Sequence, residues 1–177
     1  MLNRLLDLLL TLPAVLLAIS VHETAHVYSS YKMGDPTAKY SGRLSINPLA
    51  HFDLVGFLCM MFFHFGWAKP VPINPDNFKN RKKGIIYVSL AGPVSNLAMA
   101  IISAVLLGIL GKFTGFGALF ANHGMLKGLD VLVVMLYYCI ILNVGLMIFN
   151  LIPIPPLDGS KVLMEFLPGR IKYRIYQ

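Results

Sequence analysis

The chain contains 177 residues, of which 56% are hydrophobic and only 13% are charged. Soluble domains contain about 25% charged residues, so this composition excludes an ordinary soluble protein and favours a polytopic membrane protein. The net charge of +7 does not indicate nucleic-acid binding, because the basic residues are not interleaved with a soluble aromatic surface. We therefore expect one membrane-embedded domain over residues 1–177, with the lipid bilayer as its surroundings and no nucleic acid partner.

The first expected element is a membrane helix from about Leu5 to Tyr31. Its part up to Val21 carries a single charged residue, Asp7, and its length exceeds the roughly 20 residues that a bilayer requires. A cleavable signal peptide is not expected, because no cleavage site follows a short apolar core in this stretch. The segment therefore predicts the first spanning helix.

The next region, between residues 32 and 83, is more irregular. The segments 39–47 and 68–74 alternate weakly between apolar and polar residues, which predicts short, β-hairpin-like strands. Between them, the apolar stretch Leu54–Gly66 has 13 residues. That length fits a short re-entrant or interfacial element at least as well as a fourth membrane span.

Two further spanning helices are expected at about Gly84–Leu110 and Leu129–Phe149. With the first helix they predict an all-α polytopic membrane protein that has a three-helix core. Small residues and one asparagine step by four along the second of these helices, which predicts a ridge for close helix packing: Gly92, Asn96, Ala100, Ala104 and Gly108.

The distribution of lysine and arginine predicts the orientation. If Leu54–Gly66 does not cross the bilayer, 12 of the 15 basic residues lie on one side; if it crosses, the better split is 10 to 5. The positive-inside rule favours the first arrangement, with the basic side in the cytoplasm. We expect a multi-pass protein of the cell membrane, with the C-terminal ends of the first and third helices at the cytoplasmic side.

The motif His22-Glu23-Thr24-Ala25-His26 lies inside the first apolar helix. Residues four apart share one helix face, so the two imidazoles can bind one Zn²⁺ while Glu23 acts as general base on water. The alternative is a pair of histidines that simply satisfy each other in a core. An ionisable Glu23 within a hydrophobic segment argues against it, because such residues are costly in the membrane and mark functional sites.

Catalytic zinc sites have three protein ligands and a water molecule, so a third protein ligand is needed besides the two histidines. The third helix is expected to end near the same membrane face as the motif, and Asp158 follows it after the prolines at 153, 155 and 156. An irregular segment at membrane depth must be buried in protein or line a wet cavity, which favours Asp158 as the third ligand. Glu165, His51 and His64 remain alternatives, whereas His123 falls on the opposite side. Asp158 could instead only cap a helix from Gly159 to Leu167.

Together, the His22–His26 motif, Ala91-Gly-Pro-Val-Ser-Asn96 and Asn150-x-x-Pro-x-Pro-x-x-Asp158-Gly resemble the site-2 protease family of intramembrane zinc metalloproteases. The resemblance implies one Zn²⁺ per chain, held by His22, His26 and Asp158, with Glu23 as general base. It also implies that Asn150 orients substrate or stabilises the oxyanion, with Asn96 a second candidate for such a role. The chain resembles compact prokaryotic members without a PDZ domain. These usually continue with another membrane helix, so we expect a C-terminally truncated form.

The expected function is hydrolysis of peptide bonds within or next to the transmembrane segment of a protein substrate. The segments near 39–47 and 68–74 are expected to hold the substrate extended by strand addition. Two other functions use the same residues. One is a membrane metal-binding or transport protein, in which Glu23 is not needed. The other is a membrane-anchored zinc protease whose third ligand is Glu165.

Overall fold

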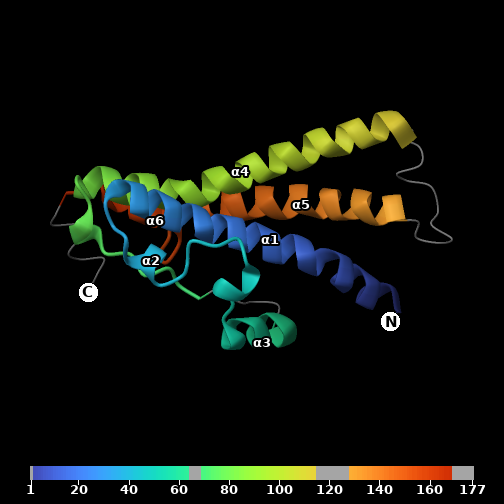
Figure 1. The fold of residues 1–177 in the computed structure, drawn as a ribbon, viewed down its shortest axis with the longest axis horizontal. Coiled ribbons are helices and arrows are strands. Elements are labelled where there is room, and N and C mark those ends of the chain that lie inside the picture. The colour runs from blue at the N-terminus through green and yellow to red at the C-terminus, as the bar shows by residue number, and fades with distance from the viewer. Residues whose placement is uncertain (1, 64–68, 115–127, 169–177) are drawn as a thin grey trace.

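In the computed structural model, three long helices form a bundle and the shorter helices are attached to it (Figure 1). The structure describes residues 2–63, 69–114 and 128–168. The long helices, α1 (Leu2–Met33), α4 (Arg81–Thr114) and α5 (Gly128–Leu151), pack against one another in all three pairs. The short elements, with η denoting a 3-10 helix, are α2 (Thr37–Tyr40), η1 (Pro48–Ala50), α3 (Leu54–Phe63), η2 (Pro75–Asn77) and α6 (Asp158–Met164).

Within the described residues, two helices are long and apolar enough to cross a bilayer: α4 over Arg81–Lys112 and α5 over Val131–Leu151. These correspond to the second and third predicted spans. The first predicted span forms the continuous helix α1, but the finding of two apolar spans does not extend to it, because the side chains of its first residues, up to residue 10, lie outside the described part. The all-α prediction is therefore confirmed, whereas the count of three spans is not.

The outer faces of α4 and α5 are apolar and uncovered. Only 22% and 11% of the residues in their most apolar windows are buried within the chain. Soluble proteins rarely expose contiguous apolar surfaces of this kind, whereas lipid accommodates them. The exposed side chains include Val94, Leu97, Ile101, Ile102, Val105, Ile141, Ile148 and Phe149.

The interior of the bundle contains small and polar side chains, which let helix backbones approach closely. Examples from all three helices are Ala18, Ser20, Ser30, Ser89, Asn96, Ala100, Ser103, Cys139 and Asn143. The predicted ridge on α4 is confirmed at Asn96 and Ala100, which are buried. It is wrong at Ala104, which is exposed, and at Gly108 no atom of the described residues lies within 4 Å of a Cβ position. The reason is that α4 diverges from the other two helices toward its C-terminal end (Figure 1).

The region between α1 and α4 differs from the prediction. No strand forms in segments 39–47 and 69–74, and residue 68 lies outside the described residues. In the second segment, Pro70 and Pro72 remove every other backbone donor, so one edge of an extended chain cannot complete a ladder. The Arg43 guanidinium instead donates to the carbonyls of Lys69 and Pro70, which ties the two segments together through a side chain.

The apolar stretch predicted at 54–66 forms α3, with residues 64–66 outside the described part. Its ten residues rise about 15 Å, half the thickness of a bilayer core. The described part is therefore too short to be a full span. Figure 1 shows α3 set apart from the three-helix bundle.

Candidate active site

His22 and His26 project from one face of α1 into the bundle, as their spacing predicts. Both are buried, with 7% and 6% of their surface exposed. Their Nε2 atoms lie 3.0 Å apart, and the rings meet edge to face. Two nitrogens so close are stable only if they share a proton or a metal ion, because two lone pairs or two N–H groups would repel.

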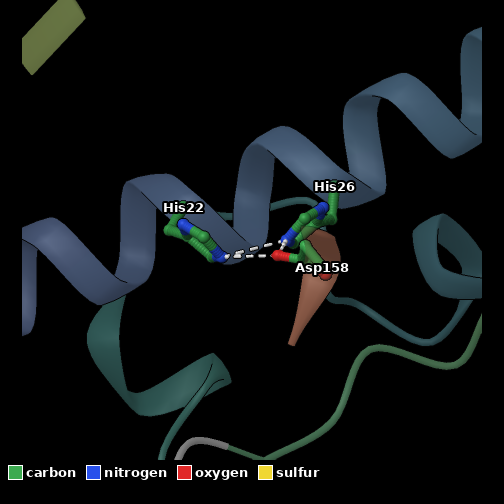
Figure 2. A group of neighbouring side chains, drawn as sticks. All are labelled: His22, His26 and Asp158. Carbon is green, nitrogen blue, oxygen red and sulfur yellow. Dashed lines mark hydrogen bonds and ion pairs between the residues drawn. The ribbon is translucent and has the colours of Figure 1, made fainter. Parts of the chain in front are cut away.

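Asp158 completes the cluster from a distant part of the chain. It is the first residue of α6 and is 6% exposed. Its Oδ2 lies 3.3 Å from Nε2 of His22 and 3.1 Å from Nε2 of His26 (Figure 2). Among the described residues, these three form the group of potential metal ligands, and all three are buried.

The triangle of donor atoms fits a zinc ion. Its edges measure 3.0, 3.1 and 3.3 Å. Ligands in a tetrahedral zinc site with bonds of roughly 2.0–2.1 Å are about 3.3 Å apart. The donor set of two imidazoles and one carboxylate is also typical of catalytic zinc sites, which leave one coordination position open.

The second nitrogen of each imidazole is bonded to α4. Nδ1–H of His26 donates to the Val88 carbonyl at 2.7 Å, and Nδ1–H of His22 donates to Oδ1 of Asn96 at 2.9 Å. A carbonyl oxygen only accepts, so Nδ1 carries a proton, and in the neutral ring Nε2 keeps its lone pair for a metal. The two contacts fix both the tautomer and the orientation of the rings.

The two oxygens of Asp158 have different partners. Oδ2 faces the histidines, while Oδ1 accepts a hydrogen bond from Nζ of Lys161 at 2.9 Å. Burial alone would raise the pKa of Asp158, but the facing His22, His26 and Lys161 lower the pKa well below its usual range. The carboxyl group is therefore ionised, which is the form that binds metal.

A cleft of about 1050 Å³ lies in front of this cluster, and its lining includes His22, Glu23, His26, Asn150 and Asp158. The rest of the lining combines apolar side chains with a few polar and charged ones. Glu23 is half-buried on the same helix as the two histidines. Asn150, in the last turn of α5, donates one N–H of its amide to the Leu146 carbonyl at 3.0 Å. The amide has a second N–H, so Asn150 can still donate toward the cleft.

Comparison with known proteins gives the relationship. A protein-family model with the description "Peptidase family M50" matches residues 10–177. The chain belongs to peptidase family M50. It is 39% identical over 163 residues to "Putative zinc metalloprotease YwhC" of Bacillus subtilis, which covers 92% of this chain and 71% of that protein. It is 28% identical over 166 residues to "Putative zinc metalloprotease Rip2" of Mycolicibacterium smegmatis, covering 90% of this chain and 58% of the relative. No solved structure matches the chain significantly.

These matches confirm the resemblance to the site-2 protease family and identify the chain as a metalloprotease with a metal cofactor. The match covers α4, α5 and α1 from residue 10 onward, so the cluster and the cleft both lie within the family domain. The residues that would hold the metal in this M50 peptidase are those whose donor atoms already form the triangle.

Two of the rival metal ligands, His51 and Glu165, lie within the described part of the M50 peptidase but outside the His22, His26 and Asp158 group. His51 is buried, and its Nε2–H donates to the Ser45 carbonyl at 2.7 Å, which fixes the loop before α3. Glu165 lies on the cleft lining but outside the His22, His26 and Asp158 group. His64 and His123 fall outside the described residues.

Two glycines at the site could not be recognised as site residues from the sequence. A Cβ on Gly92 would lie 2.5 Å from Cε1 of His22 and 2.5 Å from Nε2 of His26, so α4 touches both imidazoles through bare backbone. A Cβ on Gly159 would lie 2.3 Å from the Leu151 carbonyl, so the end of α5 packs directly on the residue after Asp158. The Gly-Pro and Asp-Gly pairs were visible in the sequence, but only tertiary contacts reveal these roles.

Proposed function

We propose that this M50 peptidase is a zinc-dependent intramembrane protease, which hydrolyses peptide bonds within or next to the transmembrane segment of a protein substrate. One observation carries the proposal: the buried triangle of His22, His26 and Asp158 stands beside Glu23 in a cleft inside a bundle with uncovered apolar faces. The names of the relatives, which describe zinc metalloproteases, support the choice of zinc.

The depth of the cluster supports cleavage within the membrane. His26 lies seven residues before the end of α1, and its partner Val88 lies seven residues after the start of α4. At 1.5 Å per residue, both counts place the cluster about 10 Å inside the end of the bundle. This depth is reached by a transmembrane segment but not by a soluble protein at the membrane surface.

The site end of the bundle is also the basic end. The described lysines and arginines there are Lys32, Lys39, Arg43, Lys69, Lys79, Arg81, Lys82, Lys83 and Lys161, whereas Lys112 lies toward the other end of α4. By the positive-inside rule, this end faces the cytoplasm. We therefore propose a multi-pass protein of the cell membrane with the active site toward the cytoplasmic side.

His22, His26 and Asp158 would hold the zinc ion through Nε2, Nε2 and Oδ2, one ion per chain. When bound, zinc supplies a Lewis acid that polarises the scissile carbonyl and lowers the pKa of water. The ligand set has a net charge of −1, from Asp158 alone, so most of the charge of the ion remains available to polarise the substrate. The hydrogen bonds of Asn96, Val88 and Lys161 hold the ligands in place during the reaction.

Glu23 is the proposed general base. It accepts a proton from the attacking water and delivers this proton to the amine of the leaving peptide. Asn150 lines the cleft opposite α1, on α5, and its second amide N–H is proposed to bind the substrate carbonyl as negative charge develops on the oxygen. For Asn96 we propose a role on His22 and not on substrate, because its carbonyl oxygen accepts from Nδ1 of that histidine and Asn96 is not among the described residues that line the cleft.

The segment 69–74 is proposed to hold the substrate. Although it forms no strand with its own chain, Pro70, Val71 and Ile73 line the cleft. Pro70 and Pro72 leave one edge without donors, so only the edge of Val71 and Ile73 can pair with an extended peptide. Pairing along this edge would keep the scissile bond extended, which an α-helical substrate segment requires before its carbonyl can be attacked.

The test is the substitution Glu23→Gln in the full chain, with zinc content and cleavage of a transmembrane test substrate measured on the same preparation. We expect one zinc ion per chain and loss of cleavage by at least about 100-fold, because the base is lost and the ligands are kept. Asp158→Ala should lose zinc, while Glu165→Ala should retain it. Full turnover by Glu23→Gln would refute the assignment of the base.

The other two functions would give different results. A metal transporter would transport its ion equally well after the Glu23→Gln substitution, and its wild type would cleave nothing. A protease with Glu165 as third ligand would lose zinc on Glu165→Ala and keep it on Asp158→Ala. The position of Asp158 in the triangle supports Asp158, and not Glu165, as the third ligand.

A further inference from the structure

A second buried carboxylate, Asp35, lies outside the metal cluster and has no part in the proposed chemistry. It follows Gly34 at the end of α1, and none of its surface is exposed. No ion pair to Asp35 occurs within the described ranges; the groups that surround it are neutral donors. A buried carboxylate is retained only when hydrogen bonds replace its water.

Five hydrogen bonds converge on Asp35 from two sides. From its own side, Ser30 Oγ donates to Oδ2 at 3.1 Å, and both the backbone N–H and the hydroxyl of Thr37 donate to Oδ1. From the segment before α4, the backbone N–H of Asn74 donates to Oδ2 at 2.8 Å and Asn77 Nδ2 donates to Oδ1 at 2.9 Å. Asp35 therefore joins the end of α1 to the chain around η2.

Two backbone contacts strengthen this junction. The N–H of Lys79 donates to the Met33 carbonyl at 3.1 Å. Gly34 has a φ of 115°, and a Cβ at this position would lie 2.9 Å from the Asn77 carbonyl. The chain of 74–79 is thus pressed against the end of α1, with Asp35 between them.

The residues next to the anchored ones face the active site. Ile73, Pro75 and Phe78 line the cleft, and they directly neighbour Asn74 and Asn77, the two residues bonded to Asp35. On the other side, Ser30 lies one helical turn after His26. A single carboxylate therefore connects the helix of the metal ligands to the apolar wall of the cleft.

We propose that Asp35 is a positioning residue, which sets the distance between the substrate-binding wall at residues 70–78 and the metal ligands on α1. The proposal rests on the proposed function, because it assumes that the wall binds the substrate. It predicts that Asp35 affects substrate affinity and the position of cleavage, while zinc binding is unaffected. Burial alone would raise the pKa of Asp35, but hydrogen bonds from Thr37, Asn77 and Asn74 lower the pKa to about 2, so the junction is intact at neutral pH.

The substitution Asp35→Asn affects the hydrogen bonds at the two carboxylate oxygens differently. An asparagine can keep its oxygen at the Oδ1 position and still accept from Thr37 and Asn77. Its NH₂ group then occupies the Oδ2 position and faces the Asn74 N–H, where two donors repel. The hydroxyl of Ser30 can rotate and accept instead. The substitution therefore releases Asn74, between Ile73 and Pro75, with little change of volume.

The experiment uses the full chain and a labelled transmembrane test peptide. The Kd of this peptide is measured in the Glu23→Gln background, and KM, kcat, zinc content and the cleavage position are measured with Glu23 present. For Asp35→Asn we expect Kd and KM to rise about tenfold, with wild-type zinc content and kcat within about threefold. The cleavage position should also spread to neighbouring bonds. Asp53→Asn is the control, because it neutralises a carboxylate outside both the junction and the cleft lining, and the asparagine oxygen can still accept from the Gly56 N–H.

Unchanged Kd and KM in Asp35→Asn would overturn the proposal, and so would loss of zinc, which would mean that Asp35 supports the fold of α1 as a whole. If Asp35→Asn does not fold, Asn77→Ala removes one donor and should raise KM about threefold, and an unchanged KM there would also overturn it. The proposed function fails separately, if the wild type shows no Glu23-dependent cleavage.

Discussion

The contact between α4 and the two imidazoles leads to a sharp prediction for Gly92→Ala. The added Cβ would lie 2.5 Å from His22 Cε1, 2.5 Å from His26 Nε2 and 2.6 Å from His22 Nε2. Ordinary contacts of a Cβ begin at 3.4 Å, so a gap of about 0.9 Å must open. Metal–ligand distances tolerate only about 0.2 Å, which is several times less.

Neither way of opening this gap preserves the site. If the imidazoles move, the triangle with Asp158 Oδ2 is lost. If α4 moves instead, the bonds from His26 to Val88 and from His22 to Asn96 lengthen together, because both acceptors lie on α4. From 2.7 and 2.9 Å they would reach about 3.6–3.8 Å, beyond hydrogen-bonding distance. We therefore expect zinc affinity to fall roughly 100-fold, with cleavage reduced in parallel.

The assay is competition for zinc with a chelator of known affinity, on detergent-purified protein whose helix content is checked by circular dichroism. Gly108→Ala is the matched control, because it makes the same change on the same helix where nothing lies within 4 Å. It should bind zinc like the wild type. If Gly92→Ala binds zinc as tightly as Gly108→Ala, the close approach of α4 to the imidazoles does not control the metal site, and the reasoning fails.

Two further predictions concern the partners of the ligands. Asn96→Leu removes the acceptor of the His22 Nδ1–H at nearly constant volume and should weaken zinc binding about 10–100-fold. Asn96→Asp keeps an acceptor and should lose less zinc affinity. The chelator assay distinguishes the two variants. Lys161→Met should weaken zinc binding by about tenfold or less, since 51% of the lysine side chain is exposed and solvent screens the pair. Lys161→Arg should restore affinity, and equal affinities in both lysine variants would show that the cation does not orient Asp158.

How much of the site the sequence could predict depends on how far apart along the chain the contacting residues lie. His22 and His26 lie four residues apart on one helix, so helical geometry alone placed them together. Asp158 could be proposed only because the third helix had to end at the same face, and Glu165 stayed open until the fold placed it outside the group. The bond of Asn96 to His22 was not predictable, because it depends on the rotation of α4 relative to α1.

The same reasoning explains why the expected strands at 39–47 and 68–74 were wrong. Alternation of apolar and polar residues indicates which face of an extended segment is buried. It does not indicate whether the backbone can form the hydrogen-bond ladder of a sheet. Pro70 and Pro72 remove the donors of one edge, and the Arg43 side chain takes the carbonyls of Lys69 and Pro70. The segments still lie together, through side-chain hydrogen bonds instead of a sheet.

A buried carboxylate inside an apolar helix bundle is costly unless it has a partner, and the fold meets this requirement without placing the metal-binding acid on one of the long helices. Asp158 enters from the end of the bundle, after the prolines that end α5, so its carboxylate reaches the imidazoles while Lys161 stays half-exposed beside it. The metal ligands are then held by α4, and the cleft wall is held by Asp35. Gly92→Ala should therefore act on zinc with the wall intact, and Asp35→Asn on substrate with zinc intact. If both variants lose zinc and substrate together, this end of the bundle is one cooperative unit, and the two roles cannot be assigned to separate residues.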